Sequence, residues 1–201
     1  MTPDEPTNID YHEIACQQVL AEDHSVFSIQ WIVVPPAANP SMDSERLMEQ
    51  YLAYIKRFTL SLVRPAQGKD CLELRLACSA IPLIKFSHPA HLTTPQGSCS
   101  TLRICGGVLV QPKECERGQL DFQVERIDEG TRITLQLSDY CPLLLGSSKP
   151  SPWRRWLYRL TQAAIHKVVT VRFLAMVYQQ VTGERPKTRV IKVARRKGKA
   201  T

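Results

Sequence analysis

The sequence lacks any run of about 18 uncharged apolar residues, the length that a membrane-spanning helix needs. Its most apolar stretch, residues 160–178, still contains His166, Lys167 and Arg172. The first residues, MTPDEPTNIDYHE, are acidic and lack the basic and apolar regions of a secretory signal. These absences predict a cytoplasmic protein without a transmembrane segment.

Short catalytic and metal-binding motifs are absent as well. The seven cysteines are spread along the chain, and no two form the C-x-x-C pair that usually marks a zinc site. The stretch ICGG lacks the spacing of a nucleotide-binding loop, and no G-x-S-x-G, P-loop or H-E-x-x-H motif occurs. We therefore predict no metal, no cofactor and no catalytic residue. Whether the protein is an enzyme stays open, with a non-enzyme favoured.

Charge is distributed unevenly along the chain. Residues 1–45 contain eight acidic residues and no Lys or Arg, whereas residues 185–201 contain eight basic residues and no acid. The net charge of +7 is therefore largely a property of the C-terminal end. We divide the chain into an acidic N-terminal segment (1–25), one folded domain (26–183) and a basic C-terminal tail (184–201).

Cap residues and apolar spacing indicate two helices. The first is expected from Asp43 to Lys56. The second is expected from Pro152 to Thr182, ending at Gly183. The core-facing stripe of the second helix is predicted to be Trp153, Leu157, Leu160, Ala164, Val168, Val171, Ala175 and Tyr178. Its opposite face, which includes His166, Thr170, Phe173 and Val177, would then meet solvent or the rim of a cavity.

Between the two helices the apolar residues alternate with a period of two, which is typical of strands. Asp128-Glu129-Gly130 predicts a hairpin. Strands are predicted at 27–34, 58–63, 71–77, 101–110, 119–127 and 131–137, and a short strand followed by a loop is predicted within 81–100. The fold class is therefore α+β, with a curved, mostly antiparallel sheet wrapped around a long C-terminal helix.

This order of elements resembles the helix-grip fold of the START-like, or polyketide cyclase-like, superfamily. The resemblance covers about residues 26–182. The superfamily usually has two short helices after the first strand, where this sequence argues for one, and it requires neither the acidic start nor the basic tail. The resemblance implies a cavity between sheet and C-terminal helix for a lipid, sterol, polyketide or other apolar molecule. Some members catalyse cyclisation or hydrolysis there, and many only bind.

The expected function is the binding of an apolar or amphipathic small molecule, lipid-like or aromatic, without catalysis. The candidate polar contacts of this ligand are His166, Arg172, Tyr140 and Tyr158. Plainer roles stay open for three of them. His166 could make one ordinary hydrogen bond near solvent. Arg172 could lie along the helix with its charge in water, or pair with an acid of the sheet. Tyr140 could belong to a loop that closes the core.

The basic tail supports a second hypothesis, binding of RNA or an anionic membrane surface. The residues that would carry it are Arg185, Lys187, Arg189, Lys192, Arg195, Arg196, Lys197 and Lys199. Two alternatives are a disordered solubilising tail and an arm that lies on the acidic N-terminal segment of the same molecule or of a partner. A cyclase- or hydrolase-type enzyme that uses the cavity is the third hypothesis.

Overall fold

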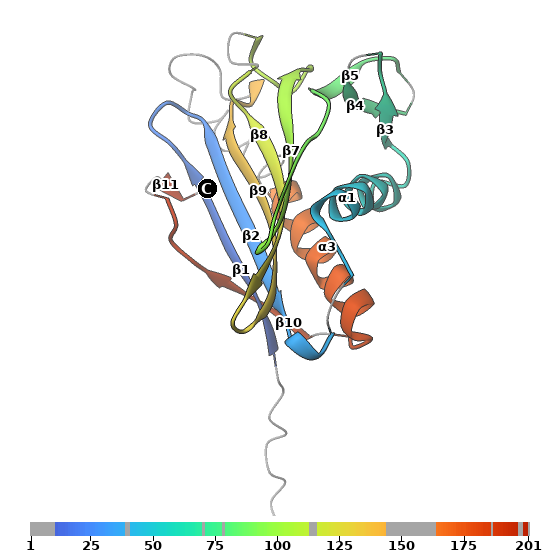
Figure 1. Ribbon diagram of the computed structural model, residues 1–201. Helices are drawn as coiled ribbons and strands as arrows, with labels where there is room; N and C mark the ends of the chain where they lie inside the picture. The colour runs from blue at the N-terminus through green and yellow to red at the C-terminus, as the bar shows by residue number, and fades with distance from the viewer. Residues whose placement is uncertain are drawn as a thin grey trace, which may run out of the picture.

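The computed structural model describes residues 11–38, 41–69, 71–77, 79–112, 116–143, 164–185, 187–196 and 199–200. Within them the chain is an α+β fold, with an open, mostly antiparallel sheet and two α-helices on one side of it (Figure 1). The helices are α1 (Ser44–Phe58) and α3 (Ala164–Thr182), and a short 3-10 helix, η1, spans Pro36–Ala38. None of these described helices is long and apolar enough to cross a membrane.

Eleven strands of the described residues form the sheet. They are β1 (Tyr11–Leu20), β2 (Val26–Val34), β3 (Val63–Gln67), β4 (Leu72–Leu76), β5 (Pro82–Phe86), β6 (Ala90–Thr94), β7 (Gly97–Gly106), β8 (Gln119–Ile127), β9 (Gly130–Tyr140), β10 (Lys187–Lys192) and β11 (Lys199–Ala200). The order is β10-β1-β2-β9-β8-β7-β5-β4-β3, with β11 beside β1 and β6 beside β7. Among these pairs, the one between β1 and β10 is parallel.

Several sequence predictions are confirmed. Strands β2, β8 and β9 lie where alternation placed them, and β8 and β9 are joined by the predicted hairpin. Gly130 begins β9 with a φ of 138°, and a Cβ there would collide with the carbonyl oxygen of Val34. Only glycine adopts this backbone without strain. Asp43 caps α1 as expected, because its side chain accepts a hydrogen bond from the Arg46 N–H at 2.8 Å.

The strand predicted at 58–63 is wrong. Phe58 is the last residue of α1, a turn follows at 59–62, and β3 begins only at Val63. Two apolar residues of the apparent alternation, Leu60 and Leu62, are exposed rather than buried. The alternation of apolar and polar residues at 58–63 therefore does not correspond to a strand with one buried face. The prediction of a short strand followed by a loop within 81–100 also missed the hairpin between β6 and β7.

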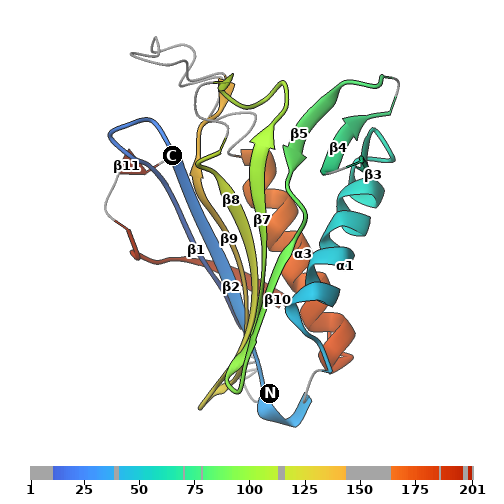
Figure 2. The same ribbon diagram turned by 45° about the horizontal axis from the view of Figure 1, so that its top comes forward.

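The predicted folded domain, residues 26–183, is too short at both ends. Strand β1 lies within the segment 1–25, and its residue Ile14 belongs to the hydrophobic core. Strands β10 and β11 lie within the segment 184–201, and both pair with β1 (Figure 2). Parallel pairing joins residues far apart in sequence, such as Glu13 and Arg189, so no local turn signal announces it.

Helix α3 ends at Thr182, and Gly183 follows with a φ of 78°, the left-handed conformation of a glycine helix stop. Residues 152–163 of the predicted helix lie outside the described residues. The prediction of its core-facing stripe is wrong in part: Phe173 and Val177 are fully buried, whereas Val168 is 43% exposed. The helix is apolar on nearly every side, so the sequence pattern alone cannot choose which face meets the sheet.

The sheet has an inner face, which meets the helices, and an outer face. On β2 the inner face carries Val26, Ile32 and Val34, which belong to the core. By strand alternation the other apolar residues of β2 share the outer face; these are Phe27, Ile29, Trp31 and Val33. The outer face of β2 is thus apolar too, and the C-terminal segment covers part of it.

A tightly packed region lies between α1, α3 and the middle of the sheet. The rings of Tyr51 and Phe122 are 5.4 Å apart, and those of Tyr51 and Phe173 are 5.1 Å apart. Full burial of each phenylalanine contributes about 1.5–3 kcal/mol to folding. The start of α1 is held on β7, because the Ser44 N–H donates to the Ser98 hydroxyl at 2.8 Å. These contacts fix α1 across the inner face.

Candidate ligand pocket

A pocket of about 340 Å³ lies between the inner face of the sheet, the second half of α1 and the beginning of α3. Its described lining consists of Gln18, Val26, Tyr51, Leu52, Ile55, Thr59, Val63, Leu74, Ile84, Phe86, Ile104, Leu109, Leu120, Leu137, Tyr140, Ile165, His166 and Val169. The volume lies in the range of small-molecule sites.

The described lining of the pocket contains no residue that is charged at neutral pH. Its polar members are Gln18, Tyr51, Thr59, Tyr140 and His166, and the other lining residues are apolar. A charged ligand group inside this pocket would lose its hydration without meeting a counter-ion among the described residues, which is strongly unfavourable. The chemistry of this lining therefore suits an uncharged apolar molecule with few hydrogen-bonding groups.

His166, which the sequence predicted as a polar contact of the ligand, lines the pocket. The residue is half-buried, and the loss of hydration around its imidazole lowers its pKa from the ordinary value of 6.5 to about 4. The ring is therefore neutral at physiological pH. A neutral imidazole offers one N–H donor and one nitrogen acceptor, so it can bind a hydroxyl or a carbonyl group.

Two buried tyrosines complete the polar part of the lining. The Tyr140 hydroxyl donates to the Leu109 carbonyl at 2.9 Å, and burial raises its pKa well above the ordinary value of 10. Burial raises the pKa of Tyr51 to about 12, although the nearby Thr170 hydroxyl acts in the opposite direction. The Thr170 hydroxyl is buried and makes no hydrogen bond of normal geometry. Both phenols are thus neutral.

The other two predicted ligand contacts fare differently. Arg172 is absent from the described lining, and its guanidinium lies 5.8 Å from the centre of the Phe58 ring on the exposed side of α3. This stacking is the plainer role of an arginine whose charge stays in water. Tyr158 lies outside the described residues. The structure therefore brings His166 and Tyr140 to one pocket and leaves Arg172 away from it.

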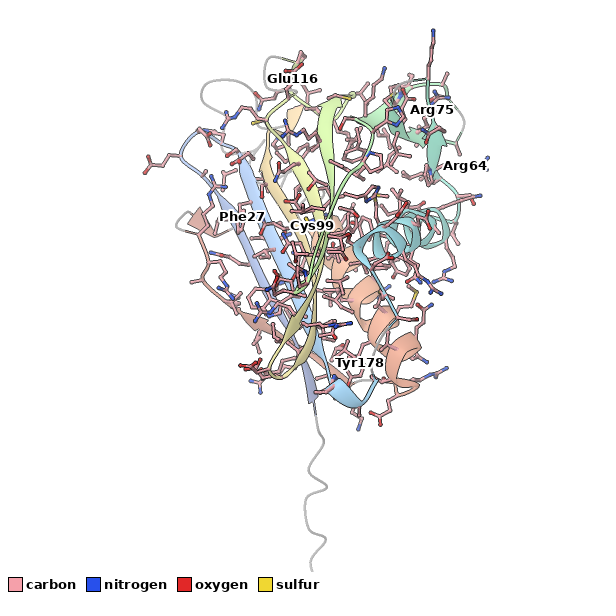
Figure 3. All side chains as sticks on the ribbon, in the orientation of Figure 1. Phe27, Arg64, Arg75, Cys99, Glu116 and Tyr178 are labelled. Carbon is pink, nitrogen blue, oxygen red and sulfur yellow. The ribbon has the colours of Figure 1, made fainter. Side chains whose placement is uncertain are left out.

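The basic C-terminal segment is a pairing partner of β1, so one alternative from the sequence, an arm on the N-terminal segment, is confirmed. The Gln17 side chain accepts hydrogen bonds from the N–H groups of Arg195 and Arg196 at 2.6 and 2.9 Å. The guanidinium of Arg195 lies over Trp31 and that of Arg196 over Phe27, at 5.1 and 5.4 Å. Figure 3 places Phe27 near β1 and β2, away from the α3 residue Tyr178.

The remaining basic residues of this segment have varied surroundings. Arg196 also forms an ion pair with Asp139 at 2.9 Å. Arg185, Lys187, Arg189 and Lys192 are exposed, and so are Arg195 and Arg196 despite their contacts with the sheet. Lys197 lies outside the described residues, and Lys199 belongs to β11. Two of the eight predicted polyanion contacts are thus engaged with the sheet itself.

Sequence reasoning missed Gln18, Tyr51 and Thr59 as pocket residues. Gln18 lies on β1, which was not predicted as a strand. Tyr51 lies within the predicted first helix, but it was not predicted as a ligand contact. Thr59 fell in the wrongly predicted strand. A correct end for α1 would have placed Thr59 beside Ile55 on the same helix side, one turn apart.

Comparison with protein-family models, with curated proteins and with solved structures finds no match for this chain.

Proposed function

We propose that this protein binds an uncharged apolar or amphipathic small molecule, lipid-like or aromatic, between the sheet and α3, without changing it chemically. The observation that carries the proposal is the apolar pocket with His166 as a neutral hydrogen-bonding group in its wall. We also propose that the arrangement is a helix-grip of the START-like kind. The last α-helix on the inner face of an antiparallel sheet supports this, whereas strands β10 and β11 extend the pattern.

The ligand would lie against the leucines and isoleucines of the pocket and place one polar group at His166. Burial of apolar surface supplies most of the affinity, at about 25 cal/mol per Å² before the cost of association. One hydrogen bond to the imidazole adds about 1 kcal/mol and fixes the orientation. A free carboxylate or phosphate is disfavoured inside, because the described lining offers no cation.

Native mass spectrometry of the purified full-length protein, followed by organic extraction, tests the proposal. The expected result is a bound molecule in one-to-one ratio that is released on denaturation. The variant Ile84→Phe fills the pocket from β5, and Ile29→Phe makes the same change on the outer face of β2. Occupancy should fall in the first variant only. A folded wild type with no adduct, and no affinity for a panel of fatty alcohols, sterols and aromatic ketones, rejects the proposal.

Polyanion binding by the C-terminal segment is the alternative, and the exposed Lys187, Arg189 and Lys192 favour it. Deletion of residues 185–201 is a poor test, because it also removes the strand that covers the edge of β1. The triple replacement of these three residues by Gln keeps the strand. If the C-terminal segment binds polyanions, this triple variant should bind RNA more weakly than the wild type, and its RNA binding should depend less on salt concentration. Unchanged binding would reject it.

A further inference from the structure

Five exposed apolar side chains follow one end of the sheet, and we name this set the apolar rim. Its members are Leu60, Leu62, Ile81, Val108 and Leu143, which are between 46% and 91% exposed. Single exposed apolar residues are common on soluble proteins and need no explanation. A contiguous apolar patch, in contrast, usually marks a surface that binds something.

Backbone hydrogen bonds connect the segments that carry the apolar rim. The Ala77 N–H donates to the Leu62 carbonyl at 2.8 Å, at the end of β4. The Val108 N–H donates to the carbonyl of Pro82, the neighbour of Ile81, at 3.1 Å. The Leu143 N–H donates to the carbonyl of Leu109 at 2.9 Å. Because β3 pairs with β4 and β4 pairs with β5, the segments that carry the apolar rim are neighbours all the way from Leu62 to Leu143.

The turn that carries Leu60 is held firmly in an unusual conformation. Leu60 and Ser61 have φ values of 51° and 65°, in the left-handed region that residues with a side chain rarely adopt. The Ser61 N–H donates to the Lys56 carbonyl at 2.7 Å, and Arg64 Nε donates to the Ser61 carbonyl at 2.9 Å. Leu60, at 91% exposure, is thus presented to solvent by an ordered turn. Such strain often accompanies a functional role.

Residues next to the apolar rim line the pocket. Thr59 and Val63, at the two ends of the Leu60 turn, both line the pocket, and so does Leu109. The Thr59 hydroxyl accepts a hydrogen bond from the Val63 N–H at 3.0 Å, which ties the turn to the pocket wall. Ile165, another lining residue, is 58% exposed. The segments that carry the apolar rim therefore adjoin the wall of the pocket.

The part of the chain that carries Leu60, Leu62 and Ile81 is basic. Residues 56–85 contain six basic and two acidic residues. One of the acids, Glu73, is buried and already paired with Arg75 at 2.5 Å and Lys85 at 3.6 Å. Lys56 and Arg64 are exposed, and Figure 3 shows Arg64 at the outer margin of the molecule beside β3. Exposed leucines flanked by basic side chains match the chemistry of an anionic bilayer surface.

We infer that the apolar rim docks on an anionic lipid bilayer, with Leu60 and Leu62 in the interface and Lys56 and Arg64 at the headgroups. Docking stands on the exposure, order and charge of this surface, and it does not require an occupied pocket. It extends the proposed function, because an apolar ligand could then pass between bilayer and pocket without crossing water.

Sedimentation of the full-length protein with vesicles tests the inference. Two compositions are compared, phosphatidylcholine alone and phosphatidylcholine with phosphatidylserine. The wild type should bind the serine-containing vesicles and lose binding at high salt. Leu60→Asn should weaken binding at least about tenfold. Asparagine tolerates the left-handed backbone at this position, so the fold is expected to survive the change. Lys56→Glu should weaken binding about tenfold as well.

Matched controls carry the same changes at a distance from the rim. Leu92→Asn replaces an exposed leucine on β6, which pairs with the other half of β7. Lys187→Glu reverses a charge on β10. Both should bind vesicles like the wild type, and circular dichroism confirms the fold of every variant. Four outcomes overturn the inference. The first two are that the wild type does not bind vesicles, or that Leu60→Asn binds them fully. The third is that Lys187→Glu loses vesicle binding while Lys56→Glu keeps it. The fourth is a wild-type dimer that does not bind vesicles and that Leu60→Asn dissociates.

The pocket variant Ile84→Phe separates this inference from the proposed function. If the apolar rim alone docks, this variant keeps its vesicle binding while it loses the bound molecule. Vesicle binding by a protein that never carries a ligand supports the rim and rejects the pocket. A protein that carries a ligand but ignores vesicles supports the pocket and overturns the rim.

Discussion

The space between the sheet and the two helices has two unlike ends. At the packed end, where α1 begins and α3 finishes, Leu47, Phe173, Leu174, Val177 and Tyr178 are all at most 1% exposed. At the hollow end, where α1 finishes and α3 begins, a pocket of about 340 Å³ remains. Protein interiors normally fill such space, so one end of the core provides stability while the other retains room.

A pair of phenylalanine truncations tests this difference most strongly. Phe173→Ala at the packed end should lower the free energy of unfolding by about 3–5 kcal/mol, because it opens a void that its neighbours cannot fill. Phe86→Ala in the pocket wall should lower it by only about 2 kcal/mol, since a void is already there. Urea unfolding measures both losses of stability, provided that the dependence of the unfolding free energy on urea concentration is the same in both variants and in the wild type. Equal losses would show that the two ends are packed alike.

The pH dependence of stability reports on the hollow end. His166 stays neutral in the folded protein down to a pKa of about 4, whereas in the unfolded chain it takes up a proton below its ordinary pKa of 6.5. The unfolded state therefore binds more protons in this window, and stability falls as the pH drops from 6.5 to 4, by about 3 kcal/mol at most. Unfolding curves of wild type and His166→Gln across this window measure it. If the stability of His166→Gln falls with decreasing pH as much as that of the wild type, other titrating groups cause the pH dependence.

Added volume should have opposite consequences at the two ends. Leu174→Phe overfills the packed end and should destabilise the protein by about 1–3 kcal/mol. Ile84→Phe enters free space at the hollow end, and its effect should stay within about 1 kcal/mol of zero. Thermal unfolding of the two variants gives the comparison. A large loss for Ile84→Phe would mean that the pocket cannot hold even a benzyl group.

The smallest expected effect concerns the cap of α1. Asp43→Ala removes the hydrogen bond to the Arg46 N–H and should lower stability by about 1 kcal/mol. Asp43 lies at the packed end, and it is absent from the described pocket lining. The change should therefore leave ligand occupancy as it was in native mass spectrometry. Loss of the ligand without unfolding would show that the two ends are coupled through α1.

Local signals in the sequence were sufficient for several elements. The Asp43 cap, the Gly183 stop and the Asp128–Gly130 hairpin each depend on the backbone preference of one or two residues. These preferences act over a few residues and survive in almost any tertiary context. They placed the start of α1, the end of α3 and the hairpin between β8 and β9.

Two of the five polar residues in the described pocket lining were also accessible from the sequence. His166 and Tyr140 were predicted as ligand contacts because they are polar residues in apolar surroundings, and both line the pocket. Arg172 met the same criterion and faces away from it. Six residues separate His166 from Arg172, so their directions differ by about 120° around the helix axis. An apolar helix carries no pattern that fixes its rotation.

The sequence by itself determined the α+β class, the antiparallel middle of the sheet and the presence of a last helix, because alternation and caps are local properties. Only the tertiary structure decided that β10 pairs with β1, that the inner face of β2 is the one with Val26 and Ile32, and that the core stays hollow at one end. Each of these depends on contacts between distant residues, whose free energy is gained only when the whole sheet and both helices meet.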